Sequence, residues 1–136
     1  MAMPTVTVCP FLHYRDAPGA IRFLVRAFGL TENLVVPGPG GTVAHAQLGW
    51  RGGVIMLSSQ LRADERVPLL TTGPGLLHLV TEDVDAHHAG AVAAGAEILD
   101  PPRDTDHGSR GYTARDPEGN VWRFDTYAPV PAPDAA

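Results

Sequence analysis

The sequence predicts an α+β fold built from two βαβββ modules, and three observations support this prediction. The 136 residues have the length of one domain, and the composition, 44% hydrophobic and 18% charged, is that of a folded globular protein. The order of strand-like and helix-like segments in the first half recurs in the second half. An offset of 67 residues (83 − 16 and 119 − 52) places Asp16 on Asp83 and Gly52 on Gly119.

The first module is predicted to span residues 5–58. A strand over 6–14 precedes a helix for which Asp16 is a suitable N-cap and Gly29 a suitable end. Apolar residues recur in this helix at helical spacing, and three strands follow it. These helical residues are Ile21, Leu24, Val25 and Phe28, and the three strands are expected over 32–36, 42–49 and 54–58.

The second module is predicted over residues 74–127, after a connector at 59–73, and a tail rich in proline and alanine follows at 128–136. Its helix is expected to begin after Asp83 and to end at Gly95. We expect this helix to bury Ala89, Val92 and Ala93, while His87 and His88 are expected to be solvated. The strands of this module are expected over 76–81, 97–99, 111–115 and 121–127.

Alternation along the strands predicts two curved sheets, each with a helix on one face and a cavity on the other. The apolar face toward the helices comprises Val8, Leu12, Ala44, Ala46, Leu48, Ile55, Leu57, Leu77, Leu79, Trp122 and Phe124. The candidate ligand-pocket residues are Cys9, Phe11, His13, His45, Gln47, Met56, Ser58, Leu76, His78, Arg110, Tyr112, Arg123 and Asp125. Arg110 is included because the predicted loop 100–110 could close over the cavity.

Charge and composition exclude several functions. The net charge is −5 and the pI is about 5.6, which argues against nucleic-acid binding. All ten basic residues are arginine, so lysine Schiff-base chemistry is excluded. Cys9 is the only cysteine, so no internal disulfide can form. No signal peptide and no apolar run of about 20 residues is apparent, and we expect a cytoplasmic protein that does not bind membranes.

Three segments carry a family resemblance: DAPGAIRF…RAFG, DVDAHHAG…AAGAEI and RDPEGNVWRF. Their order resembles the vicinal-oxygen-chelate superfamily, also called the glyoxalase/bleomycin resistance protein/dioxygenase family, over residues 5–127. The resemblance implies a paired βαβββ fold, a homodimer and a cavity in each curved sheet. It also implies, for catalytic members, a divalent metal held by one residue from each of the first, fourth, fifth and eighth strands.

The four positions that correspond to those metal ligands are Cys9, Met56, Leu76 and Arg123. The resemblance implies His, Glu or Gln at such positions, and none of these four residues is of those types. Leucine offers no donor atom and arginine repels a cation, so we expect neither a metal nor another cofactor. A displaced metal site formed by His13, His45 and His78 remains an alternative.

The individual residues leave alternatives open. Arg123 suits a carboxylate, phosphate or enol oxygen of a ligand, or a salt bridge to Asp125. The three histidines could supply a general base or only line the pocket. Cys9 is either a nucleophile or a small buried group. Flat ligands could stack on Phe11, Trp50, Met56 and Tyr112, or these residues could belong to the core.

Three functions remain, and the first is favoured. The first is a binding protein that sequesters a small aromatic or anionic molecule, as antibiotic-resistance members of the family do. The second is an enzyme, either a lyase or isomerase with a histidine base or a dioxygenase-like enzyme with a displaced metal. The third is a regulatory domain with a vestigial pocket. A shared fold does not distinguish them.

Overall fold

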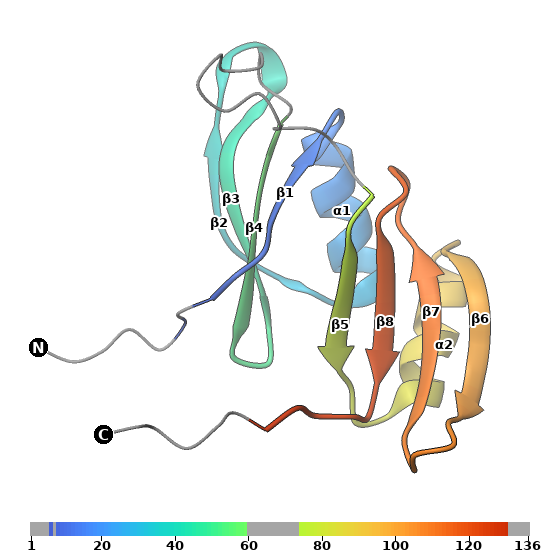
Figure 1. Cartoon of the computed structure of the whole chain (residues 1–136). Helices are drawn as coiled ribbons and strands as arrows, with labels where there is room; N and C mark the ends of the chain where they lie inside the picture. The colour runs from blue at the N-terminus through green and yellow to red at the C-terminus, as the bar shows by residue number, and fades with distance from the viewer. Residues whose placement is uncertain (1–5, 7, 60–73, 131–136) are drawn as a thin grey trace, which may run out of the picture.

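The computed structural model describes residue 6 and residues 8–59 and 74–130, which form two four-stranded sheets and two α-helices (Figure 1). Most of the predicted connector 59–73 and residues 131–136 of the predicted tail lie outside the described residues. The elements of the first half are β1 (Phe11–Tyr14), α1 (Ala17–Phe28), β2 (Thr31–Pro37), a short 3₁₀ turn (Pro39–Gly41), β3 (Val43–Trp50) and β4 (Gly53–Ser59). Those of the second half are β5 (Leu76–Val80), α2 (Val84–Ala93), β6 (Glu97–Asp104), β7 (Arg110–Arg115) and β8 (Val121–Asp125).

The two sheets have the same strand order, which confirms the predicted pair of βαβββ modules. The first sheet has the order β1-β4-β3-β2, and the second has the order β5-β8-β7-β6. In each sheet the first and last strands of the module pair in parallel, and the other neighbours are antiparallel. As a result, β1 and β5 are both edge strands, and they flank the junction of the two sheets (Figure 1).

Both helices begin at the predicted aspartates. The Asp16 carboxylate accepts a hydrogen bond from the Gly19 N–H (3.0 Å), and Asp83 accepts one from the Ala86 N–H (3.0 Å). Each interaction satisfies a backbone donor that the first helical turn leaves unpaired. Gly29 ends α1 in the left-handed conformation (φ 77°), which glycine adopts without steric cost.

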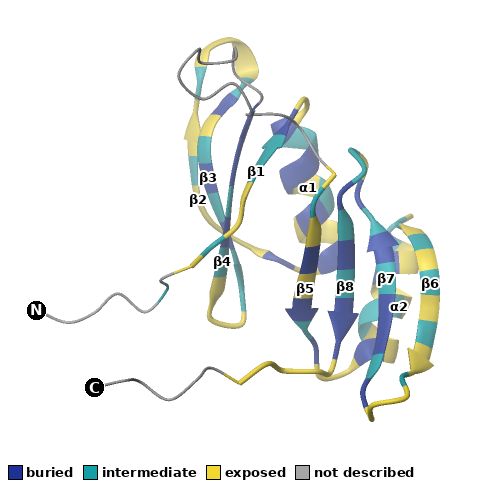
Figure 2. Cartoon of the chain, in the orientation of Figure 1, coloured by how far each residue is buried: buried dark blue, intermediate teal, exposed yellow. Residues whose placement is uncertain are grey.

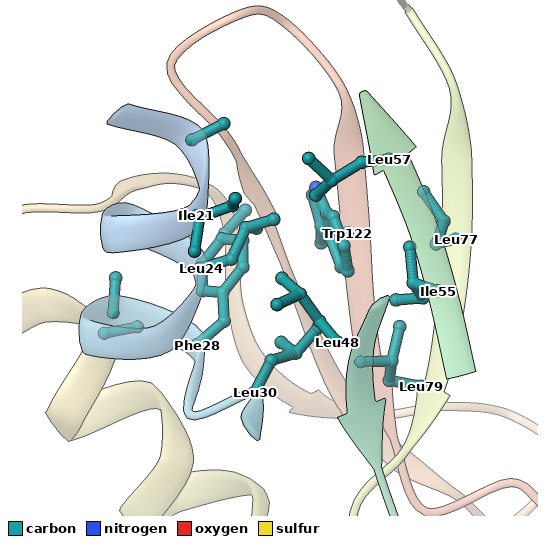
Figure 3. Close-up of a cluster of buried hydrophobic side chains, with 14 of the residues drawn as sticks. Ile21, Leu24, Phe28, Leu30, Leu48, Ile55, Leu57, Leu77, Leu79 and Trp122 are labelled. Carbon is teal, nitrogen blue, oxygen red and sulfur yellow. The ribbon is translucent and has the colours of Figure 1, made fainter. Parts of the chain in front are cut away.

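The helix-facing sides of both sheets pack into one hydrophobic core (Figures 2 and 3). Phe28 of α1 packs against Trp122 and Phe124 of the second sheet, with ring centroids 5.5 and 5.0 Å apart. The same cluster also contains Ile55 and Leu57 of β4, Leu77 and Leu79 of β5, and Leu24 of α1. The two modules therefore share a core, and neither buries its apolar face alone.

The strand boundaries differ from the prediction by more than one residue in three places. Strand β6 continues to Asp104, so the predicted loop 100–110 is reduced to residues 105–109. Pro101 and Pro102 are tolerated because β6 is an edge strand, where a missing N–H need not remove a ladder hydrogen bond. Strand β1 begins only at Phe11, and β8 ends at Asp125.

Helix α2 buries a different face from the predicted one. Ala89, Val92 and Ala93 are exposed, whereas Val84 and Ala91 are buried. His87 and His88, which lie on the same face as these two residues, are partly buried and not solvated as expected. The prediction was wrong because alanine occurs all around this helix, so apolar spacing does not distinguish its faces. Smaller departures are Val8, Val25 and Ala44, which are exposed although an apolar environment was predicted.

Candidate functional site

The face of the first sheet that points away from the core gathers several of the predicted pocket residues. Strand register aligns Gln47, Met56 and Phe11 in one row across β3, β4 and β1, and His13 pairs with Ser58 in the next row. The Phe11 ring stacks on His13 (centroids 5.0 Å apart, 26° between planes) and lies 6.0 Å from the His45 ring. This face therefore presents an aromatic ring flanked by two imidazoles.

Two residues of this face were missed by the sequence analysis. Leu34 pairs with Gln47 and Val36 pairs with His45, which places both on the same face as the imidazoles. They are 43% and 41% exposed, so both add apolar surface to this face. Because the two residues are two positions apart in a strand, alternation could have placed them on one face, but the sequence analysis assigns no face to the residues of β2.

The corresponding face of the second sheet carries several polar groups beside the exposed Leu76. Register places His78, Arg123 and Thr113 in one row across β5, β8 and β7, and Asp125 in the next. The His78 Nε2 lies 2.8 Å from the backbone oxygen of Tyr127, which can only accept. The Nε2 therefore carries the hydrogen, and in the neutral ring Nδ1 is left as an acceptor.

A crevice of about 810 Å³ opens between the two sheets, bounded by the edge strands β1 and β5. Phe11 lies on its β1 side, and Leu76 and His78 lie on its β5 side. Phe11 is 45% exposed and Leu76 is 75% exposed, so both present apolar surface to solvent. The residues that line the crevice are Val8, Pro10, Phe11, Leu12, Trp50, Arg51, Gly53, Val54, Ile55 and 75–80.

Of the predicted pocket residues, Phe11, Leu76 and His78 line this crevice. The predicted residues that do not line it but lie on or near the open faces of the sheets are Cys9, His13, His45, Gln47, Met56, Arg123 and Asp125. The remaining three have other surroundings. Tyr112 is completely buried on the helix side, because it pairs with the core residue Phe124 and so shares its face. Arg110 does not line the crevice, because it bonds to Asp85 (2.9 Å) and Asp104 (3.2 Å). Ser58 is buried, and its hydroxyl donates to the backbone oxygen of Ser59. The assignment of Tyr112 and Arg110 to the pocket was therefore wrong.

His87 connects the two modules. One ring nitrogen, Nε2, donates to the backbone oxygen of Phe28 at the end of α1 (2.6 Å). The other, Nδ1, lies 2.6 Å from the Tyr112 hydroxyl, and the ring packs 4.1 Å from that of Phe124. Burial lowers the pKa of His87, although the bond to Phe28 opposes this shift. His87 and Trp50, whose Nε1 donates to the backbone oxygen of Val80, therefore belong to the module interface.

The DPEGN segment also has a structural role. The buried Asp116 carboxylate accepts hydrogen bonds from the Tyr14 hydroxyl (2.6 Å), the Trp122 indole N–H (3.1 Å), and the backbone N–H and side-chain amide of Asn120. Burial and the neighbouring Asp116 charge raise the pKa of Tyr14, so its hydroxyl stays protonated as the donor. These bonds hold β1 of the first module to the 116–120 turn of the second.

The residues at the family's metal positions do not fit a metal. Cys9 lies before β1. Met56 offers only a thioether, and Leu76 offers no donor atom. The Arg123 guanidinium is positively charged and already bonds to Asp125. Within the described ranges 8–59 and 74–130, no three His, Cys, Asp or Glu residues lie close enough to hold a metal ion together.

The fold defines a class of protein in which two βαβββ modules are paired and a crevice lies between their sheets. Comparison with known proteins gives the family. The sequence model of the Glyoxalase/Bleomycin resistance protein/Dioxygenase superfamily matches residues 8–124. The chain belongs to this superfamily, as its sequence resemblance implied.

Individual relatives agree with this family membership. The uncharacterized protein Mb0911c of Mycobacterium bovis is 36% identical over 118 residues, covering 83% of this chain and 78% of that protein. The crystal structure of TioX from Micromonospora sp. ML1 is 32% identical with a TM-score of 0.75, covering 88% of this chain and 97% of that one. A glyoxalase/bleomycin resistance protein/dioxygenase from Nocardioides (21% identical, TM-score 0.67, 100% and 91% covered) shares the fold.

No helix among the described residues has the length and apolar character needed to cross a membrane.

Proposed function

We propose that the protein binds and sequesters a small organic molecule with a planar aromatic ring, in the crevice between β1 and β5. The observation that carries this proposal is the exposure of Phe11 and Leu76 on opposite walls of a recess of about 810 Å³. Such volumes are typical of sites for small molecules, which are mainly apolar with a few polar groups.

The surroundings of Phe11 favour an aromatic ligand. Its ring already stacks on His13 and lies close to His45, so the three rings form a preformed surface on the first sheet. A planar ring placed against this surface gains area burial and stacking, which is worth about 0.5–1.5 kcal/mol per aromatic pair. The Gln47 amide, 3.1 Å from His45, adds a polar group that can orient a ligand.

We further propose that the protein is a homodimer. Both β1 and β5 are edge strands, and exposed edges of this kind are usually paired or covered. Phe11 and Leu76 on these strands are exposed, as are Leu34 and Val36 on β2 at the opposite edge of the first sheet. These exposed apolar side chains are consistent with surfaces that a second copy covers in part. Analytical ultracentrifugation at micromolar concentration tests this proposal, and a monomer would contradict it.

Binding is tested by titrating planar aromatic probes into the full chain and following their fluorescence anisotropy. Phe11→Ala should weaken binding about tenfold, the equivalent of about 1.4 kcal/mol. The side chain is half-exposed, so this substitution should leave the fold intact. Val25→Ala, on the exposed side of α1, is the matched control and should bind as the wild type does. Equal affinities for all three proteins would refute the proposed site.

A further inference from the structure

Arg51 lies in the turn between β3 and β4, in a backbone conformation that arginine rarely adopts. The two strands are joined by a two-residue loop, Arg51 and Gly52, and Trp50 pairs with Gly53 across it. Both loop residues have positive φ angles, 52° and 103°. Turns of this kind favour asparagine followed by glycine, because most side chains are strained at positive φ and asparagine tolerates it. An arginine at the first position is therefore unfavourable for folding, and strain of this kind is concentrated at functional sites.

The same arginine lies at the crevice. Among the described residues that line the crevice, Arg51 is the only one with a permanently charged side chain. Most of the others are apolar, and the Trp50 indole N–H already donates to the Val80 carbonyl (2.9 Å). A ligand in the crevice therefore meets one cationic group, at the end where β3 turns into β4.

The contact that Arg51 makes with the second module leaves most of its donors unused. Its Nη2 donates to Oε1 of Glu82 (2.7 Å). A guanidinium has five N–H groups, and this contact occupies one of them. Both side chains are well exposed, 46% for Arg51 and 82% for Glu82. Because an exposed ion pair contributes little free energy, a ligand carboxylate can share the guanidinium with Glu82 or displace it at small cost.

The distance from the turn to the aromatic wall limits the size of a ligand that contacts both. Phe11 pairs with Met56, which is three residues from Gly53 at the start of β4. At a rise of about 3.3 Å per residue, Phe11 lies about 10 Å along the strands from the end of the turn. A bicyclic aromatic ring with a carboxylate spans most of this distance, and the long arginine side chain covers the rest.

We infer that the crevice selects planar aromatic carboxylates, and that Arg51 is the residue that determines this preference. This inference rests on the proposed function and narrows its ligand class. The planar fork of a guanidinium donates two parallel hydrogen bonds to a carboxylate, whereas an uncharged amide offers only one oxygen and no charge. The ring of such a ligand lies against Phe11 and Leu76, as in the proposed function.

The experiment compares two probes with the same ring, naphthalene-2-carboxylate and naphthalene-2-carboxamide, by isothermal titration calorimetry. Titrations use the full chain at about pH 8, where the carboxylate is ionised and histidine is mostly neutral. We expect the wild type to bind the carboxylate about fivefold more tightly, the equivalent of about 1 kcal/mol. Equal affinities, or a preference for the carboxamide, would overturn the inference and leave the proposed function standing. If neither probe binds, the proposed function fails and the inference fails with it.

Arg51→Asn tests the assigned residue. We expect the carboxylate to bind this variant about fivefold more weakly than the wild type, while the affinity for the carboxamide is unchanged. Arg103→Asn is the matched control, because it removes the same charge from an arginine that also bonds to a carboxylate, Asp100 (2.9 Å), but does not line the crevice. An equal loss of carboxylate affinity in both variants would show a general effect of net charge and overturn the inference.

Thermal stability distinguishes ligand recognition from a structural role of Arg51. Asparagine suits the positive φ better than arginine, so Arg51→Asn should melt at the wild-type temperature or a few degrees above it. The lost ion pair with Glu82 is exposed and offsets little of this gain. A variant that melts several degrees lower and still prefers the carboxylate would show that Arg51 serves the fold, and this result would overturn the inference.

Discussion

Acid is expected to destabilise the protein through His87, and a glutamine at this position should remove that part of the sensitivity. The folded protein needs the neutral imidazole, because Nε2 donates to the Phe28 carbonyl while Nδ1 accepts from the Tyr112 hydroxyl. The rings packed around it, Trp50, Phe124 and Tyr112, carry no charge that could stabilise an imidazolium. Burial accordingly lowers the pKa of His87 below its ordinary value of 6.5.

The sign and size follow from linkage between protonation and folding. Above pH 6.5 both states hold a neutral ring, and the stabilisation is complete. As the pH falls below 6.5, the unfolded chain gains a proton that the folded chain resists, so the free energy of unfolding decreases. The decrease is at most about 1.4 kcal/mol per pH unit and stops at the lowered folded pKa. We expect less than this limit, because the ring is only partly shielded from water.

The assay is urea unfolding of wild type and His87→Gln, followed by tryptophan fluorescence between about pH 7.5 and pH 5. Near pH 7.5 the variant should be less stable by about 1–3 kcal/mol, because the glutamine amide cannot place its donor and acceptor where the imidazole places Nε2 and Nδ1. This difference should shrink as the pH falls, since only the wild type loses the His87 contribution. His88→Gln, one residue away, is the control. Parallel stability curves for wild type and His87→Gln would refute the reasoning.

Three further predictions concern stability. Asp116→Ala leaves the Tyr14 hydroxyl and the Trp122 indole without their acceptor, and denaturant titration should show a loss of about 3–5 kcal/mol; a loss below about 1 kcal/mol would contradict the role of this carboxylate. Leu57→Ala opens a cavity in the shared core and should cost about 2–5 kcal/mol in the same assay. Arg110→Ala breaks only exposed ion pairs and should leave the melting temperature unchanged in a calorimetric scan.

The fold could be predicted from the sequence because its two halves repeat the same signals. The capping aspartates, the strand alternation and the closing glycines are local features, and each produced the expected element. The buried face of α2 could not be predicted, because Ala89 and Val92 are as apolar as Val84 and Ala91. His87 was missed because a histidine is buried only when specific partners, here Phe28 and Tyr112, come from distant parts of the chain.

The site was predicted less completely than the fold. Alternation correctly placed Phe11, His13, His45 and Arg123 on faces away from the core, since it depends only on position along a strand. The crevice itself depends on how the two sheets meet, which no local pattern records. The ion pair of Arg123 with Asp125 was one of the alternatives. That Gly111 leaves room for this pair could be recognised only from the register of β7 against β8.

The contacts of the 116–120 turn have a consequence for synthesis on the ribosome. Tyr14 bonds to Asp116, and the N–H groups of Arg15 and Asp16 donate to Glu118, across sequence separations of 102 and 103 residues. The opening strand pairs with β4 of its own module, but the bonds that fix its end cannot form until the 116–120 turn has emerged. Such long-range pairing slows folding and leaves apolar strands unprotected in the meantime. The duplicated halves are thus a single cooperative folding unit, completed by its C-terminal turn.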